Sequence, residues 1–204
     1  MRRRVYAVAA LVVAVAGLSP VVHDATHHSF AVHMIQHLVL VLVVAPLLAA
    51  GTTEAYAPRG RWATAAVSVV LLHTIAMWGW HLPALYEAAA ANDGLHVGEH
   101  VSFLGTAWIF WLLVLRDGDH LKRAGAVFAV GLQSAALGAL LTFASEPLYA
   151  SHAGGYPRWG LTALEDQQLA GGIMWVPPGI VYLAVTLGLL RGWLKRSGEP
   201  VTDP

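Results

Sequence analysis

Residues 30–51, FAVHMIQHLVLVLVVAPLLAAG, form the stretch that most constrains the fold, because they contain no acidic residue, lysine or arginine. An apolar helix of about 20 residues, rising roughly 1.5 Å per residue, crosses the hydrocarbon core of a bilayer. The first turns nevertheless carry His33 and His37, four residues apart. Side chains at this spacing share one helix face, and ionisable groups are costly inside a membrane. The pair therefore predicts a functional site within a transmembrane helix.

The composition supports a membrane protein throughout. Of the 204 residues, 57% are hydrophobic and only 12% are charged, whereas ordinary soluble domains contain about 25% charged residues. The 12 basic and 12 acidic residues balance, which gives no reason to expect nucleic acid as a partner. Cysteine is absent, so disulfides, iron–sulfur clusters and thiolate zinc sites are excluded. Any metal ion must be held by histidine, methionine or oxygen.

Apolar runs predict an all-α fold, a polytopic helix bundle forming one membrane domain over residues 1–204. Six spans are expected, at about residues 5–19, 30–50, 62–81, 95–115, 124–143 and 169–190. The first run is short and follows a basic start, so it is either a retained span or a cleaved signal peptide. Small residues in the fifth span, at Gly131, Ser134, Ala135 and Gly138, favour close helix packing.

The connections between these spans are also predicted. Residues 20–30 are expected to form an exterior loop, and residues 83–94 a short interfacial helix. Pro46 is expected to kink the second span, and Pro177 with Pro178 to kink or break the last one.

The lysines and arginines orient the bundle. If both termini are cytoplasmic, every lysine and arginine except Arg158 falls on the cytoplasmic side, as the positive-inside rule requires. Arg59 and Arg61 then lie in an interior loop. Of the eleven histidines, only His120 lies on this inner side, so a histidine-rich site should open outward.

Histidines of separate spans reach the same depth in this topology. His96 and His100 repeat the four-residue spacing at the outer start of the fourth span, and the third span carries His73 and Met77 deeper down. Imidazole binds copper, zinc, iron and nickel, and a thioether favours Cu(I). We therefore predict the metal ligands His33, His37, His73, Met77, His96 and His100. Supporting roles are expected for His81, Glu99, Asp166, Gln167 and Met174.

Copper is the preferred metal, because the site faces an oxidising exterior and offers histidine and methionine without a thiol; its oxidation state stays open. Zinc, iron and haem are the alternatives. A membrane metal-dependent hydrolase, a di-iron oxidase, a haem-binding helix bundle and a transporter are competing functions. The outer histidines His23, His27 and His28 either feed metal to the site or form a solvated loop, while His120 and His152 are expected to be packing residues.

Four segments carry a family resemblance: HMIQHLVLVLVVAPLL at 33–48, HTIAMWGWHLPALYEAA at 73–89, LHVGEHVSFLGTAWIFW at 95–111 and EDQQLAGGIMWVPPG at 165–179. In this order they resemble the multi-spanning CtaG-like assembly factors of cytochrome c oxidase. The family's recurrent positions fall on His33, His37, His73, Met77, Trp78, His81, His96, Glu99, His100, Asp166, Gln167, Gln168, Met174 and Trp175. The family is often drawn with a seventh span, which this sequence does not show.

The resemblance implies a non-catalytic factor of the bacterial plasma membrane, needed to build an active haem–copper oxidase through copper handling on the outer face. Its expected partners are the lipid bilayer and either cytochrome c oxidase subunits or a copper chaperone. The oligomeric state is left open, with a homo-oligomer among the alternatives. Hand-over of copper is favoured over transport, because the inner half of the predicted bundle offers no polar path.

Overall fold

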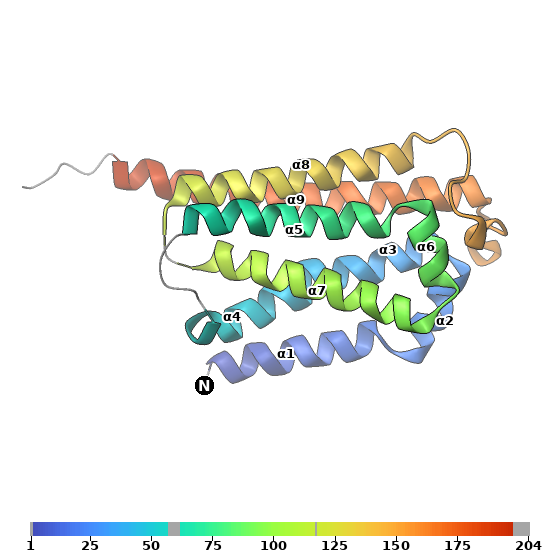
Figure 1. The fold of residues 1–204 in the computed structure, drawn as a ribbon, viewed down its shortest axis with the longest axis horizontal. Coiled ribbons are helices and arrows are strands. Elements are labelled where there is room, and N and C mark those ends of the chain that lie inside the picture. The colour runs from blue at the N-terminus through green and yellow to red at the C-terminus, as the bar shows by residue number, and fades with distance from the viewer. Residues whose placement is uncertain (1, 57–61, 117, 198–204) are drawn as a thin grey trace, which may run out of the picture.

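The computed structural model describes residues 2–56, 62–116 and 118–197. Within these ranges the chain is helical and forms no β-strand, which confirms the all-α prediction. The elements, shown in Figure 1, are α1 (Arg2–Gly17), α2 (Pro20–His28), α3 (Phe30–Val39), the π-helical turn η1 (Leu40–Val44), α4 (Ala45–Tyr56), α5 (Trp62–Trp80), α6 (Pro83–Ala90), α7 (Asp93–Leu115), α8 (His120–Thr142), the 3-10 turns η2 (Ala150–His152) and η3 (Pro157–Trp159), and α9 (Ala163–Ser197).

Four described helices are long and apolar enough to cross a membrane: Phe30–Thr52, Asp93–Leu115, His120–Thr142 and Ala163–Ser197. Two further pairs qualify only as bent spans. The helices Arg3–Gly17 and Pro20–His28 meet at 49°, and Ala66–Trp80 and Pro83–Ala90 meet at 71°. The described chain thus has four to six candidate spans, and the expected six is the upper number.

The long helices run along one axis, so the bundle has two distinct ends (Figure 1). The N-terminus, the ends of α4, α7 and α9 and the starts of α5 and α8 gather at one end. Helices α2 and α6 and the connection from α8 to α9 lie at the other. The first end carries the basic residues Arg3, Arg4, Arg116, Lys122, Arg123, Arg191, Lys195 and Arg196. Arg59 and Arg61 lie outside the described residues, and the cytoplasmic placement of this end stays a prediction.

Residues 20–28 form a helix, so the exterior loop expected over residues 20–30 is wrong. Pro20 occupies the first helical position after Ser19, where its missing N–H and fixed φ are favourable. Helix α2 ends at His28, and the hydroxyl of the next residue, Ser29, accepts the Val32 N–H and caps α3. Because only Ser29 separates α2 from α3, the histidines of α2 lie directly beside the bundle. Of the short interfacial helix expected over residues 83–94, the structure forms α6 over Pro83–Ala90, and α7 already begins at Asp93; its interfacial position stays a prediction.

Helix α9 continues through Pro177 and Pro178. Of the two predicted outcomes, a break is therefore wrong, and a kink stays a prediction. A proline at position 178 cannot donate a hydrogen bond to the carbonyl of Met174. The Ser134 hydroxyl of α8 donates to that carbonyl at 3.3 Å instead, the kind of compensation that prolines in membrane helices receive from neighbouring helices.

At Pro46 the π-turn η1 lies just before the proline, and the Ala45 N–H donates a hydrogen bond to the Leu40 carbonyl, five residues earlier. The distortion expected there is thus a local widening of the helix.

The N-terminus of α9 lies earlier than the predicted start at residue 169. Thr162 and Glu165 form a capping box: the Thr162 N–H donates to Glu165 Oε2 at 2.8 Å, and the Glu165 N–H donates to Thr162 Oγ1 at 3.3 Å. Such reciprocal bonds satisfy N–H groups that have no partner within the helix. The extra turns bring Asp166 and Gln167 into α9, buried at the end of the bundle where α3 begins.

The close packing predicted for the fifth span is present between α8 and α9. A Cβ atom added at Gly171 would lie 2.6 Å from the Thr142 nitrogen and 2.7 Å from the Gly138 carbonyl oxygen. An added Cβ at Gly138 would meet Trp175 Cβ at 2.8 Å. The two backbones therefore touch at a point where only glycine fits.

We expect Gly171→Ala to destabilise the protein by about 1–3 kcal/mol, because α8 and α9 must move apart. Thermal unfolding in detergent, followed by tryptophan fluorescence, measures the change. Gly172→Ala is the matched control: an added Cβ meets nothing within 4 Å there, so the better helix propensity of alanine should leave stability unchanged or raised by up to about 1 kcal/mol. Equal melting temperatures for the two variants would contradict the packing.

Candidate metal centre

Helices α3 and α7 bring the two predicted histidine pairs together. The ring centroids of His33 and His37 lie 4.2 Å apart on α3, and those of His96 and His100 lie 4.4 Å apart on α7. Across the helices, His33 lies 5.7 Å from His96 and His37 lies 5.1 Å from His100. The four rings thus form one cluster, at the level that the sequence predicts.

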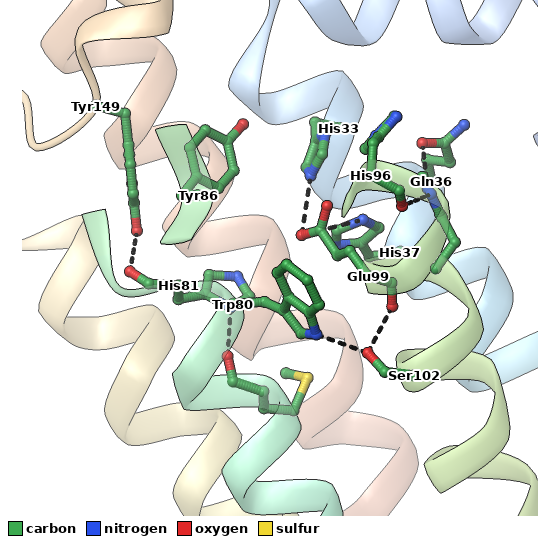
Figure 2. A network of polar contacts seen from close by, with 12 residues as sticks. His33, Gln36, His37, Trp80, His81, Tyr86, His96, Glu99, Ser102 and Tyr149 are labelled. Carbon is green, nitrogen blue, oxygen red and sulfur yellow. Dashed lines mark hydrogen bonds and ion pairs between the residues drawn. The ribbon is translucent and has the colours of Figure 1, made fainter. Parts of the chain in front are cut away.

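Glu99 lies at the centre of this cluster and is 1% exposed. Its Oε1 atom is 3.7 Å from His33 Nε2 and 3.8 Å from His37 Nε2, as Figure 2 shows. Donor atoms of His33, His96 and Glu99 all lie within 4.8 Å of one another. The sequence predicts a supporting role for Glu99, and in the structure its carboxylate lies among the predicted ligands His33, His37 and His96.

Several buried nitrogen and oxygen atoms of the cluster have no hydrogen-bond partner, although each could bind a metal ion. They are His33 Nε2, both ring nitrogens of His37, and Glu99 Oε2. Burying such groups unpaired is costly. Ligand atoms held about 2.0–2.1 Å from a tetrahedral metal ion lie about 3.3 Å apart. The separations of His33 and His37 from Glu99 would need to shrink by about 0.5 Å. For the trio His33, His96 and Glu99, whose atoms lie within 4.8 Å of one another, the closure needed is at most about 1.5 Å.

Each ring nitrogen of His100 lies 2.9 Å from an oxygen acceptor, Nδ1 from the His96 carbonyl and Nε2 from Gln36 Oε1. An imidazole with one N–H donates to only one of these two acceptors. The Gln36 amide in turn donates to the Gly17 carbonyl at 2.9 Å and so connects α3 to α1. Sequence reasoning missed Gln36, although a polar residue inside a span, one turn from His33, was an available signal.

The deeper predicted ligands, His73 and Met77, line a small cavity of about 20 Å³, here called the inner cavity. His81 Nδ1 donates to the Met77 carbonyl at 2.6 Å and leaves its Nε2 without a partner. His73 Nδ1 donates to Thr106 Oγ1 at 2.9 Å, since that hydroxyl itself donates to a backbone carbonyl. The histidines and methionines around this inner cavity are His37, His73, His81, Met34, Met77 and Met174. His37 therefore belongs to the cluster around Glu99 and also to the inner cavity.

An outer cavity of about 200 Å³ lies on the other side of the cluster, at the end of the bundle that carries α2 and α6. His27, His33, His96 and Glu99 line it together with Tyr86 and His152. The Tyr86 hydroxyl and His152 Nε2 are hydrogen bonded at 2.7 Å, and burial lowers the pKa of His152 to about 4. His152 is therefore neutral at pH 7. His152 is buried and hydrogen bonded, as predicted for a packing residue, but no sequence pattern indicated that it lines the cavity.

Asp166 and Gln167 do not reach the cluster. Asp166 accepts hydrogen bonds from Ser29 Oγ at 2.8 Å and from the N–H groups of Phe30 at 2.7 Å and Ala31 at 3.3 Å. Gln167 accepts the Leu148 N–H at 2.6 Å and holds the connection between α8 and α9. Asp166 thus supports the site indirectly, because it fixes the start of the helix that carries His33 and His37.

Comparison with known proteins identifies a family over nearly the whole chain. A family model described as cytochrome c oxidase caa3 assembly factor (Caa3_CtaG) matches residues 1–196. No curated protein and no solved structure matches the chain. The matched range contains every residue of the cluster and of both cavities.

We expect Asp166→Ala to lower the free energy of unfolding by at least about 2 kcal/mol, because a buried hydroxyl and two buried N–H groups lose their acceptor. Unfolding in detergent measures the loss, and hydrogen exchange at Phe30 and Ala31 locates it. Asp24→Ala, which removes an exposed carboxylate from α2, is the control and should change stability by less than about 0.5 kcal/mol. Unchanged hydrogen-exchange rates at Phe30 and Ala31 in Asp166→Ala would contradict a capping role for Asp166 at the start of α3.

Proposed function

The chain belongs to the family of cytochrome c oxidase caa3 assembly factors, and from this premise we propose that it binds copper in the membrane and hands it on during oxidase assembly. The observation that carries the proposal is the buried trio His33, His96 and Glu99, whose donor atoms lie within 4.8 Å of one another. Among the residues whose side chains the structure describes, no other three His, Cys, Asp or Glu residues come so close.

The chemistry of the donors favours copper as the cargo. Imidazole and carboxylate ligands bind Cu²⁺ more tightly than the other divalent ions of the first transition row. Below the trio, Met34, Met77 and Met174 line the inner cavity, and thioether sulfur is a soft ligand that suits Cu(I). Both oxidation states of copper would thus find donors along one path through α3, α5, α7 and α9.

The arrangement suits hand-over better than permanent storage. Two imidazoles and one carboxylate leave a coordination position of a four-coordinate ion free for a ligand from another molecule. The outer cavity of about 200 Å³ leads to that position from one end of the bundle. An oxidase subunit or a copper chaperone is the acceptor or donor we propose, on the outer face of a bacterial plasma membrane. This role needs no catalysis by the chain itself.

Two competing functions fit the cluster less well. A di-iron centre in a helix bundle uses several carboxylates, whereas the trio contains only Glu99. Haem ligation by two imidazoles needs a flat slot between the rings, but Glu99 Oε1 lies 3.7 Å from His33 Nε2 within the cluster. A single metal ion is the occupant that these distances support.

The test is copper binding by the full chain purified in detergent with copper and zinc both offered. We expect copper to be retained, and His33→Ala with Glu99→Ala to weaken its binding at the trio by at least about 100-fold. His28→Ala, which removes an exposed histidine of α2, is the matched control and should bind as the wild type does. Oxidase activity of cells that depend on each variant should follow the same order.

Thermal unfolding of each variant checks that the bundle is intact. Copper held at the trio with unchanged affinity by the folded double variant would contradict the proposal. Zinc or iron retained in place of copper would do so as well, and would favour a metalloenzyme.

A further inference from the structure

Helix α2 carries a histidine pair of its own beside the cluster. His23 and His27 follow the four-residue spacing, and their Nε2 atoms lie 3.2 Å apart. The ring centroid of His96, on α7, lies 5.3 Å from that of His23 and 6.2 Å from that of His27. His27 is exposed and also lines the outer cavity. Three imidazoles from two helices thus lie at the outer cavity, which Glu99 also lines.

The separation of the two Nε2 atoms matches the spacing of a metal chelate. Two nitrogens bound to one ion at about 2.0–2.1 Å lie about 2.8 Å apart at a right angle and about 3.4 Å apart in a tetrahedron. The observed 3.2 Å lies between these limits. The two Nε2 atoms are joined by a hydrogen bond and the rings lie at 85° to each other. An ion bound by both nitrogens would therefore replace the shared proton and turn the rings, which can both be reached from solvent, without moving the helix.

We propose that His23 and His27 form a second, solvent-facing copper site, which captures Cu²⁺ and passes it to the buried trio through His96. Cu²⁺ is the form that an oxidising exterior supplies, and imidazoles bind it in preference to other divalent ions of the series. Water completes the coordination at an exposed pair. The choice of copper rests on the proposed function, whereas the existence of the site rests on the geometry of α2 and α7.

His96 gives the transfer a route. Its ring lies 5.3 Å from that of His23 and 5.7 Å from that of His33, so it is a neighbour of both sites. The ion would exchange the imidazoles of α2 for His33 and Glu99 one ligand at a time, with no change of oxidation state. The carboxylate of Glu99 adds a negative charge that the exposed pair lacks, and this charge makes transfer to the buried trio favourable.

The experiment counts Cu²⁺ bound per chain in detergent, by elemental analysis and by electron paramagnetic resonance. We expect two ions for the wild type, one for His23→Ala with His27→Ala, and two for the control His28→Ala, which removes an exposed histidine of the same helix. With less than one equivalent of copper, loading of the trio should be at least about tenfold slower in the α2 double variant, because the ion is no longer held close to the trio.

The same measurement separates this inference from the proposed function. His33→Ala with Glu99→Ala should keep one ion, at α2, which supports the capture site even if the trio fails as a copper site. Two ions and unchanged loading in the folded α2 double variant would overturn the capture site and leave the trio standing. The capture site would also be overturned if the wild type bound only one ion and the His33→Ala, Glu99→Ala double variant bound none.

Discussion

The hydrogen bonds of Asp166 at the start of α3 are the contact on which the rest of the site depends. One buried carboxylate from α9 accepts the Ser29 hydroxyl and the N–H groups of Phe30 and Ala31. A negative charge at a helix N-terminus is stabilised both by these bonds and by the helix dipole. The capping box at Thr162 in turn fixes the first turn of α9. These contacts hold α3 against α9 and so turn the first histidine pair toward α7.

The cluster that results is a group of buried polar side chains inside an apolar helix bundle. Glu99 Oε2, His33 Nε2 and the ring of His37 are buried without hydrogen-bond partners, an arrangement that costs free energy unless a cation satisfies it. The imidazoles of His33, His37 and His96 lie around the Glu99 carboxylate, whereas the inner cavity below is lined by three thioethers together with three imidazoles. His37 lies between the two. In the proposed function, a copper ion that entered from the outer cavity would meet imidazole and carboxylate first, and thioether sulfur only deeper in the bundle.

Local sequence patterns predicted much of this structure, because hydropathy, four-residue spacing and the distribution of basic residues depend on neighbouring positions alone. They placed the histidine pairs of α3 and α7 at one level. They failed where a distant residue decides the outcome: Ser134 of α8 lets α9 continue past Pro178, and Asp166 becomes a cap only because Ser29 lies beside it. The polar residues of α2 suggested a loop, although Pro20 is a good first residue for a helix.

The most direct test of the copper site is X-ray absorption at the copper edge on the full chain loaded with one copper ion. The expected nearest neighbours are two imidazole nitrogens and one carboxylate oxygen at about 2.0–2.2 Å, the donors of His33, His96 and Glu99. A shell of sulfur neighbours, or one without imidazole scattering, would contradict the trio as the site where copper binds.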